Sequence, residues 1–338
     1  MQELVGTLAQ HQTLDDEGLR ILLETEDGTL LQELHERARG VAEERFGKKV
    51  YLRALIEWSN VCRNDCLYCG IRKSNGAHRR YSLTQDEILQ CCEKAWAQGI
   101  RTFVLQGGEN PPAARGLTGT VTAIREAWPE AAITLSLGEL PDETFRRLKA
   151  AGADRYLLRH ETASPVHYAK LHPAGMRLET RLQCIRTLKE LGFQTGMGMM
   201  VGSPFQTTEE LIRDLRLIER IRPEMAGIGP FIPAKGTPFA NHPAGSADKT
   251  LRLYSILRLM FPSLLIPATT ALSTLLEGGR RAGILAGANV IMPNFTPPEH
   301  RADYALYEGK SSDDPKTIEQ ELSAIGYGIS PSRGDYQA

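Results

Sequence analysis

The segment that decides the fold is residues 55–72, LIEWSNVCRNDCLYCGIR. It begins as an apolar strand and passes directly into a loop that carries three cysteines. From residue 50 onward, apolar runs rich in β-branched residues alternate with amphipathic segments, a pattern typical of parallel strands joined by helices. We therefore expect an α/β fold in which the cysteine loop follows the first strand.

The same alternation predicts about eight strands along the chain. We expect them at 51–58, 101–106, 132–137, 154–159, 194–200, 225–230, 264–269 and 288–292. Capping-box sequences at 84–87 and 207–210 predict helix starts near residues 85 and 208. Such a series of strand–helix units favours a complete (β/α)8 barrel of the TIM type, and an open doubly wound sheet is the structural alternative.

The flanks of this barrel have different patterns. Leucines at helical spacing between residues 13 and 47 predict a short N-terminal helical extension, which we assign to residues 1–48. The barrel itself is expected to span 49–310. Residues 311–338 are polar and contain one predicted helix near 316–326, so we expect a C-terminal helical tail packed on the barrel.

Composition limits the partners of the chain. Forty basic residues oppose 41 acidic ones, for a formal net charge of −1, so nothing in the overall charge favours nucleic acid or an anionic membrane. The first residues lack the basic start and apolar stretch of a secretory signal, and no later run is long enough to cross a bilayer. We therefore expect a cytoplasmic protein with a small-molecule or protein partner.

The cysteine loop has the spacing C-x3-C-x2-C, formed by Cys62, Cys66 and Cys69. Three thiolates are one fewer than a closed zinc site or a fully ligated [4Fe–4S] cluster requires, which leaves a fourth position open for chemistry. The alternatives are a zinc site completed by a distant histidine, and free thiols. The other cysteines, Cys91, Cys92 and Cys184, are expected to be buried small hydrophobic residues.

The ends of the next strands carry polar residues. The second strand ends in Gly107, Gly108 and Glu109, which by itself indicates only a turn. Alternation in the third strand puts Thr134 and Ser136 on one face. Plain β-propensity is the other explanation of that pair.

The fourth strand ends with Arg159 and Glu161 on one face, where burial is costly unless each charge meets a partner. One interpretation is an internal salt bridge between them. The interpretation that we prefer has Glu161 accepting hydrogen bonds from ribose hydroxyls and Arg159 facing an anion. Later strand ends offer Ile228 between two glycines, and the adjacent hydroxyls of Thr269 and Thr270.

The cysteine spacing, with an aromatic residue before the last cysteine, resembles the radical S-adenosylmethionine (radical-SAM) superfamily. Within it, several segments closely resemble the HydE family of [FeFe]-hydrogenase maturases, and the likeness extends from about residue 50 to residue 300. These segments are LIEWSNVCRNDCLYCGIR, RTFVLQGGEN, ITLSLGE, ADRYLLRHETASP, GIGPFIPAKGTPFA, LLIPATTA and GANVIMPNFTP.

The resemblance implies one [4Fe–4S] cluster on the three cysteines, with S-adenosylmethionine on its fourth iron. It also implies cofactor contacts from Tyr68 beside the adenine, from the Gly107–Gly108–Glu109 segment at the methionine ammonium group, and from Ser136, Arg159, Glu161, Arg181 and Ile228. Thr134, Arg159, Thr269 and Thr270 would hold an anionic substrate.

The implied reaction is reductive cleavage of S-adenosylmethionine to a 5′-deoxyadenosyl radical, which acts on an iron complex bearing CO, cyanide and cysteine. A HydG-type maturase would supply that complex, and an electron donor and transient contacts with other maturases are implied too. No cysteine follows Cys184, so a second cluster near the C-terminus, as some HydE proteins carry, is not expected. The rival functions are a mutase like methylornithine synthase and a non-catalytic iron–sulfur scaffold.

Overall fold

The computed structural model describes residues 2–307, 309 and 314–337. All pairs between named strands are parallel. The strands are β1 (Lys49–Leu52), β2 (Ala54–Ser59), β3 (Thr102–Gly107), β4 (Ala132–Ser136), β5 (Arg155–Leu157), β6 (Gln194–Met197), β7 (Met200–Val201), β8 (Met225–Ala226), β9 (Gly229–Pro230), β10 (Val290–Ile291) and β11 (Gly328–Ile329). The predicted α/β class is confirmed.

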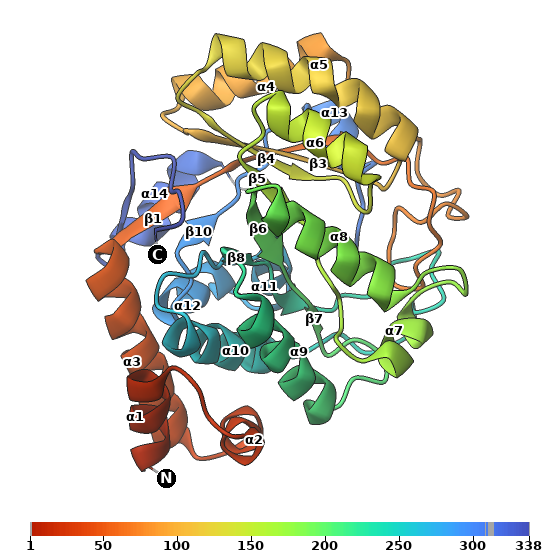
Figure 1. Cartoon of the computed structure of the whole chain (residues 1–338). Coiled ribbons are helices and arrows are strands. Elements are labelled where there is room, and N and C mark those ends of the chain that lie inside the picture. Colours follow the sequence, from red (N-terminus) through yellow and green to blue (C-terminus); the bar gives the residue numbers. More distant parts are fainter. Residues whose placement is uncertain (1, 308, 310–313, 338) are drawn as a thin grey trace.

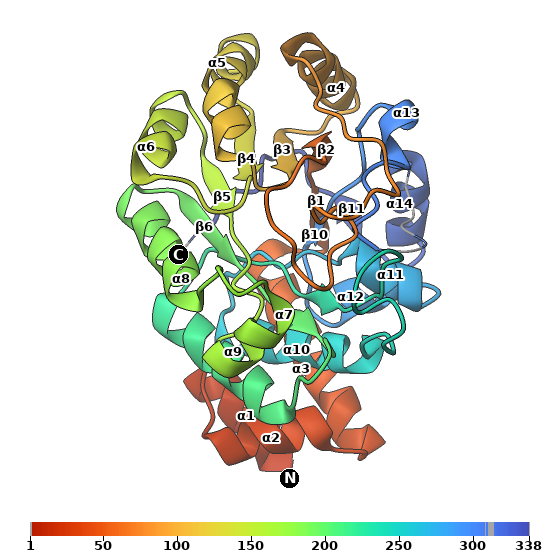
Figure 2. The same ribbon diagram turned by 90° about the vertical axis from the view of Figure 1, so that its right-hand side faces the viewer.

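Three groups of strands form the sheet. Six strands pair in the order β2-β3-β4-β5-β6-β8, three in the order β10-β1-β11, and two as β7-β9. Single parallel bridges link Met225 to Leu265, Pro267 to Val290, and Leu55 to Asn294. These bridges lead from β8 through residues 265–267 to β10, and from the segment after β10 back to β2 (Figure 2).

Several predicted strands are shorter or more broken than the sequence pattern suggests. The first is split at Arg53, and the runs 194–200 and 225–230 each form two short strands. Gly198 lies in the break between residues 197 and 200, and only glycine fits there, because a Cβ atom would lie 2.0 Å from the carbonyl oxygen of Gly227. The run 264–269 contributes only bridges at Leu265 and Pro267, and a proline cannot donate to a sheet ladder.

Helices surround the sheet, as Figure 1 shows for α4, α5 and α6 over β3 and β4. The helices after β2 are α4 (Gln85–Ala97), α5 (Pro111–Ala127), α6 (Asp142–Ala150), α7 (Pro165–Leu171), α8 (Leu178–Glu190), α9 (Thr208–Ile221), α10 (Ala247–Met260), α11 (Thr270–Leu275), α12 (Gly279–Leu285), α13 (Pro298–Arg301) and α14 (Pro315–Ser323). The predicted helix starts near 85 and 208 are confirmed, and both capping boxes form. No described helix has the length and apolar character that crossing a membrane would need.

The N-terminal segment forms three helices, α1 (Gln2–His11), α2 (Asp16–Glu24) and α3 (Gly28–Phe46). They lie beside α9 and α10, at the lower left of Figure 1. Asp16 pairs with Arg216 of α9 at 2.8 Å, and His35 of α3 hydrogen-bonds Ser255 of α10 at 2.7 Å. Polar contacts therefore join these helices to the outer helices next to them.

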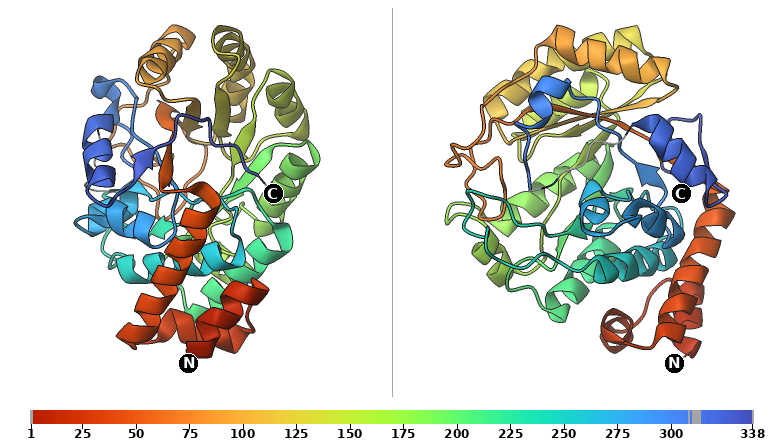
Figure 3. Two further views of the ribbon diagram at one scale, coloured as in Figure 1. Left: turned by 90° about the vertical axis from the view of Figure 1, so that its left-hand side faces the viewer. Right: turned by 180° about the vertical axis from the view of Figure 1, so that it is seen from behind.

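The chain end crosses the N-terminal ends of the strands. We call residues 328–336 the C-terminal strap. β11 within it pairs with β1, and Arg155, the buried first residue of β5, donates to the carbonyl oxygen of Arg333 at 2.9 Å and to Asp335 at 2.7 Å. Figure 3 shows the strap running across this end of the sheet. The predicted tail boundary near 310–313 lies outside the described residues.

Candidate active site

The cysteine loop follows the C-terminal end of β2, as the orange chain between β2 and α4 in Figure 2. All three of its cysteines are free and half-buried. The loop packs tightly on the end of β3, because a Cβ atom on Gly108 would lie 2.5 Å from the carbonyl oxygen of Val61 and 2.9 Å from Cβ of Cys62. A glycine is therefore required at 108 for the two strand ends to approach this closely.

Burial dominates the electrostatics of the three thiols. It raises the pKa of Cys62, raises that of Cys66 well above its ordinary value, and raises that of Cys69 to about 12. The charge of Arg80 opposes this effect at Cys62 and Cys69. Without a cation at the loop the thiols stay protonated at neutral pH, so binding iron there must displace their protons.

A chain of charges connects the loop to the next strand ends. Glu109 accepts a hydrogen bond from Arg63 Nε at 2.9 Å and another from the Glu139 backbone N–H at 2.8 Å. Arg181 of α8 pairs with Glu139 at 2.7 Å, lies 3.8 Å from Glu109, and donates to the carbonyl oxygen of Arg159 at 2.9 Å. The sequence singled out Glu109 and Arg181 but assigned no role to Glu139, which lies between them.

Arg159 and Glu161 lie together, with Nη2 and Oε2 2.9 Å apart. The proximity agrees with the salt-bridge interpretation. However, the buried Arg159 Nε makes no hydrogen bond in the described part of the chain, and the buried Arg159 Nη2 and Glu161 Oε2 have no hydrogen-bond partner beyond their contact with each other. Glu161 also has a φ of 66°, an unfavourable region for a residue other than glycine. Unpartnered polar atoms on a strained segment are typical of a site that receives a ligand.

Thr134 belongs to the same group of unpartnered atoms. Its side chain is 3% exposed, and its Oγ1 makes no hydrogen bond with any described residue. Ser136, two residues on in β4, is half-buried. Leu135 between them is buried as well, and the pleat of a strand would place it on the other face.

The later strand ends meet around Tyr254 of α10. Its hydroxyl donates to the carbonyl oxygen of Ile228 at 3.0 Å and lies 3.4 Å from Thr269 Oγ1. Burial raises the pKa of Tyr254, whereas the nearby charge of Arg159 lowers it. Thr269 also caps α11 by accepting from the Leu272 N–H, while Thr270 is the half-buried first residue of that helix. Ile228 and Thr269 thus contact one tyrosine that sequence reasoning missed.

An aromatic stack lies beside the cysteine loop. The Tyr68 hydroxyl is 3.2 Å from His172 Nε2, and the His172 ring stacks on Tyr168 with centroids 3.9 Å apart. Burial lowers the pKa of His172 to about 3, so this imidazole is neutral. Tyr168 and His172 gave no signal in the sequence, because tyrosine and histidine near a short helix are compatible with many packing roles.

His160 is a structural histidine, because both of its ring nitrogens are hydrogen-bonded within the protein. Its Nδ1 accepts from the Gly198 N–H at 3.3 Å, which leaves Nε2 to donate to Asp214 Oδ1 at 3.2 Å. The same oxygen accepts from the Ala163 N–H at 2.5 Å. Asp214 of α9 therefore holds the chain on both sides of Glu161.

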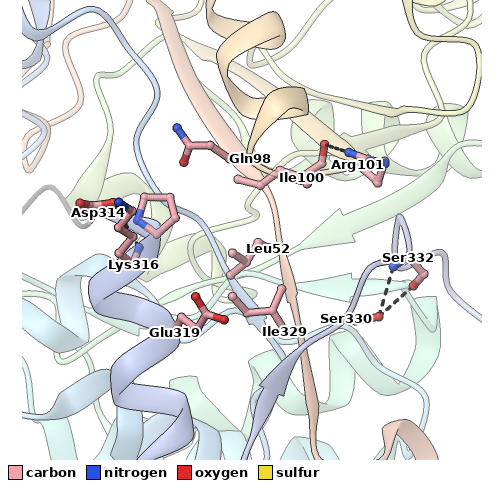
Figure 4. Close-up of a pocket in the computed structure, with 12 residues that line it drawn as sticks. Leu52, Gln98, Ile100, Arg101, Asp314, Lys316, Glu319, Ile329, Ser330 and Ser332 are labelled. Atoms are coloured by element: carbon pink, nitrogen blue, oxygen red, sulfur yellow. Dashed lines mark hydrogen bonds between the residues drawn. The ribbon is translucent and has the colours of Figure 1, made fainter.

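A cavity of about 520 Å³ lies at the other end of the strands (Figure 4). It is bordered by Leu52 of β1, by Arg101 before β3, by the start of α14 and by Ile329 of the C-terminal strap. None of the site residues predicted from the sequence lines it.

Comparisons with known proteins agree with this arrangement. The sequence model of the Radical SAM superfamily matches residues 56–218. The chain is 45% identical over 295 residues to the [FeFe] hydrogenase maturase subunit HydE of Thermotoga maritima, which covers 87% of this chain and 84% of that protein.

Two solved structures have a similar fold. The crystal structure of methylornithine synthase (PylB) superposes with a TM-score of 0.85 at 28% identity, covering 97% of each chain. The crystal structure of HydG, a maturase of the [FeFe]-hydrogenase, superposes with a TM-score of 0.84 at 23% identity, covering 97% of this chain and 75% of that one, and this likeness concerns the fold alone. From the extent and identity of the match to its relative in Thermotoga, the chain belongs to the HydE family of radical-SAM enzymes.

Proposed function

We propose that this enzyme cleaves S-adenosylmethionine reductively to a 5′-deoxyadenosyl radical, which acts on an iron–CO–cyanide–cysteine precursor during assembly of the diiron subcluster of [FeFe]-hydrogenase. The observation that carries the proposal is a three-cysteine loop at strand ends that also present buried, unpartnered polar atoms. The identity to a HydE maturase supports the placement in hydrogenase maturation.

Radical-SAM enzymes use a [4Fe–4S] cluster and S-adenosylmethionine, and we assign the cluster to Cys62, Cys66 and Cys69. In the described part of the chain no three His, Cys, Asp or Glu side chains are grouped around the position of a single metal ion. A four-iron cube needs a different arrangement, because each thiolate binds a different iron. When bound, the cluster supplies the electron that cleaves the sulfonium.

The cofactor would lie between the cysteine loop and the next strand ends. Backbone groups of Gly107 and Gly108 can approach a ligand closely, and Glu109 is fixed beside them by Arg63. We assign the ribose hydroxyls to Glu161, and its buried carboxylate oxygen Oε2, which contacts Arg159 but accepts no hydrogen bond from any described residue, supports this. Tyr68, Ser136, Arg159, Arg181 and Ile228 complete the proposed contacts.

The anionic substrate would contact Thr134, Arg159, Thr269 and Thr270. The hydroxyl of Thr134 and the Nε of Arg159, which make no hydrogen bond with any described residue, support this assignment, because a buried donor without a partner is costly until a ligand satisfies it. The chain would thus bind the precursor by charge and hydrogen bonds and orient it for the radical.

We further propose that the strands close into a complete (β/α)8 barrel over residues 49–310, which the bridges at Leu265, Pro267 and Asn294 support. Residues 1–48 would be a helical extension and residues 311–338 a tail packed on the barrel. The enzyme would act in the cytoplasm with an electron donor, take its substrate from a HydG-type maturase and contact other maturases transiently.

The proposal is tested with anaerobically reconstituted protein given dithionite and S-adenosylmethionine. We expect 5′-deoxyadenosine from the wild type and from Cys184→Ala, which removes a thiol outside the loop, but none from Cys69→Ala. Adding the protein to HydG product and apo-hydrogenase should restore hydrogen evolution. Iron analysis should give about four irons per chain, for one cluster. A wild-type protein that holds its cluster but forms no 5′-deoxyadenosine would exclude the proposal.

The likeness to methylornithine synthase supplies a second candidate, a carbon-skeleton mutase that acts on an amino acid. Incubation with lysine distinguishes the two. Methylornithine among the products would favour the mutase, whereas slow cleavage of S-adenosylmethionine that lysine does not stimulate would favour the maturase.

A further inference from the structure

The segment that follows the cysteine loop returns beside the start of that loop. Ser59 and Ser82 form an antiparallel bridge, and the Asn60 side chain accepts from the Tyr81 N–H at 2.8 Å. Asn60 also donates to the carbonyl oxygen of Arg79 at 2.7 Å. Arg80, between these anchored neighbours, is therefore held close to the point where the loop begins.

The Arg80 guanidinium donates to both ends of the loop. Its Nη1 donates to the carbonyl oxygens of Asn60 and Ile71, at 2.7 and 2.8 Å. Its Nη2 donates to the carbonyl oxygens of Arg72 and Asn75, at 2.5 and 2.9 Å. Asn60 precedes the first cysteine and Ile71 follows the last, so one planar group ties together the two ends of the segment that carries all three thiols.

The charge of Arg80 also lacks a counter-ion within the described part of the chain. Among the described residues no carboxylate pairs with it, and its partners are neutral carbonyl groups. The other arginines nearby differ, since Arg72 pairs with Asp65 and Arg79 with Asp303. Thiolates on a reduced cluster carry negative charge, and a fixed cation at close range stabilises the more negative, reduced form.

We propose that Arg80 is a positioning residue that closes the cysteine loop around the cluster and offsets the negative charge of the reduced cluster. This inference rests on the proposed cluster at Cys62, Cys66 and Cys69. The hydrogen bonds and the charge act through different properties of the side chain. They can be separated, because lysine keeps the charge but lacks the planar fork of donors.

The test compares wild type with Arg80→Gln, Arg80→Lys and the control Arg79→Gln, which removes a neighbouring charge that is 66% exposed. Two quantities are measured on reconstituted protein without S-adenosylmethionine: the rate at which a chelator removes iron, and the reduced fraction by electron paramagnetic resonance at one fixed potential. Circular dichroism verifies that each variant is folded.

We expect Arg80→Gln to lose iron about tenfold faster, in line with other residues that orient metal ligands. Its reduced-to-oxidised ratio should fall about tenfold, equivalent to about 59 mV for one electron. Arg80→Lys should lose iron faster but keep a reduced fraction near that of the wild type, and Arg79→Gln should match the wild type in both measurements.

Iron loss and a reduced fraction within twofold of the wild type in Arg80→Gln would overturn the inference. A folded Arg80→Gln protein that takes up no cluster would support the closing role. If Arg80→Gln does not fold, the test rests on Arg80→Lys. A wild-type rate of iron loss in Arg80→Lys would contradict the role of the guanidinium hydrogen bonds. Failure of the wild type itself to take up a cluster would instead reject the proposed function.

Discussion

Glu161 has a left-handed backbone conformation, and the residues on both sides of it are fixed by hydrogen bonds. The residue before it, His160, bonds to Gly198 and Asp214, and the residue at 163 donates its N–H to Asp214. A strained conformation persists only where surrounding contacts fix it. Asp214, fully buried on α9, therefore supports the orientation of Glu161 and of Arg159 beside it.

Asp214→Ala should destabilise the protein by about 2–4 kcal/mol, because it leaves two buried donors without an acceptor. It should also weaken S-adenosylmethionine binding, measured by titration calorimetry on the reconstituted protein, without lowering the iron content. Asp214→Asn keeps the oxygen that both donors use and should behave nearly as the wild type does. Equal affinity in the alanine variant would show that Asp214 does not support the site.

Local rules identified some of these residues and could not identify others. Strand alternation placed Thr134 and Ser136 on one face, while their roles rested on the family resemblance, and the cost of burying charge at a strand end singled out Arg159 and Glu161. Asp214, His172 and Arg80 depend on contacts between segments that the sequence pattern does not bring together, such as the 54 residues between His160 and Asp214. Their roles therefore became visible only in the folded chain.

At the scale of elements, the packing of the cysteine loop depends on two glycines at which neighbouring backbone approaches closely. Gly108 lets the end of β3 meet Val61, and Gly70 lies so close to the carbonyl oxygen of Ala305 that a Cβ atom would be 1.9 Å from it. The loop is thus packed on two sides by backbone. Small changes in that packing should displace the thiols together.

Gly108→Ala should reduce the iron and sulfide content after reconstitution several-fold, because the new methyl group would overlap the Val61 carbonyl and move Cys62. Gly116→Ala is the matched control. Gly116 lies in α5 with nothing within 4 Å of its would-be Cβ atom, and alanine there should stabilise the helix by about 0.5–1 kcal/mol. Full cluster content in Gly108→Ala would show that the close packing is dispensable.

The predicted elements were confirmed best where a side chain forms hydrogen bonds with the backbone of its own helix end. Thr84 with Glu87, and Thr207 with Glu210, form capping boxes that locate the starts of α4 and α9. Apolar content alone was a weaker guide. The run 264–269 has the composition of a buried strand, but it forms only single bridges. The number of ladder hydrogen bonds that a segment makes depends on the strands next to it, which its own composition does not reveal.

At the scale of the whole molecule, the two ends of the sheet differ in what lies across them. The cysteine loop and the unpartnered site atoms follow the C-terminal ends of the strands, whereas the C-terminal strap crosses the opposite ends. There Arg155, with no exposed surface, depends on Asp335 for its charge partner. The candidate active site and the contacts of the strap therefore lie at opposite ends of the sheet.

Asp335→Asn should lower the free energy of unfolding by about 1–3 kcal/mol, less than a fully buried pair would lose, because the aspartate is 35% exposed. Urea unfolding measures the loss. Glu143→Gln, which removes an exposed ion pair with Arg147, should change stability little. A change in Asp335→Asn as small as in this control would mean that the strap contributes little.

Acid should weaken the fold through buried neutral histidines. Burial lowers the pKa of His172 to about 3, and it also lowers that of His35 and His167. The unfolded chain binds these protons from about pH 6.5 downward, so stability is complete above that pH and falls below it. His172 alone should cost about 1.4 kcal/mol per pH unit between its unfolded and folded pKa values.

Unfolding by urea at pH 7.5 and at pH 5.5 measures this slope. His172→Asn can still bond to the carbonyl oxygen of Tyr168, but it does not titrate, so its slope should be smaller. Identical slopes in the two proteins would show that another group controls the acid response.

The C-terminal strap also sets an order of events during synthesis. Ribosomes release the chain from its N-terminus, and domains fold as units when their segments become available. The cysteine loop, at residues 60–70, emerges long before Asp335, so the strand end that carries Arg155 waits for its partner until residue 335 has been made. A nascent chain stalled before residue 328 would have made every residue of the candidate active site while lacking the segment that crosses the opposite end of the sheet.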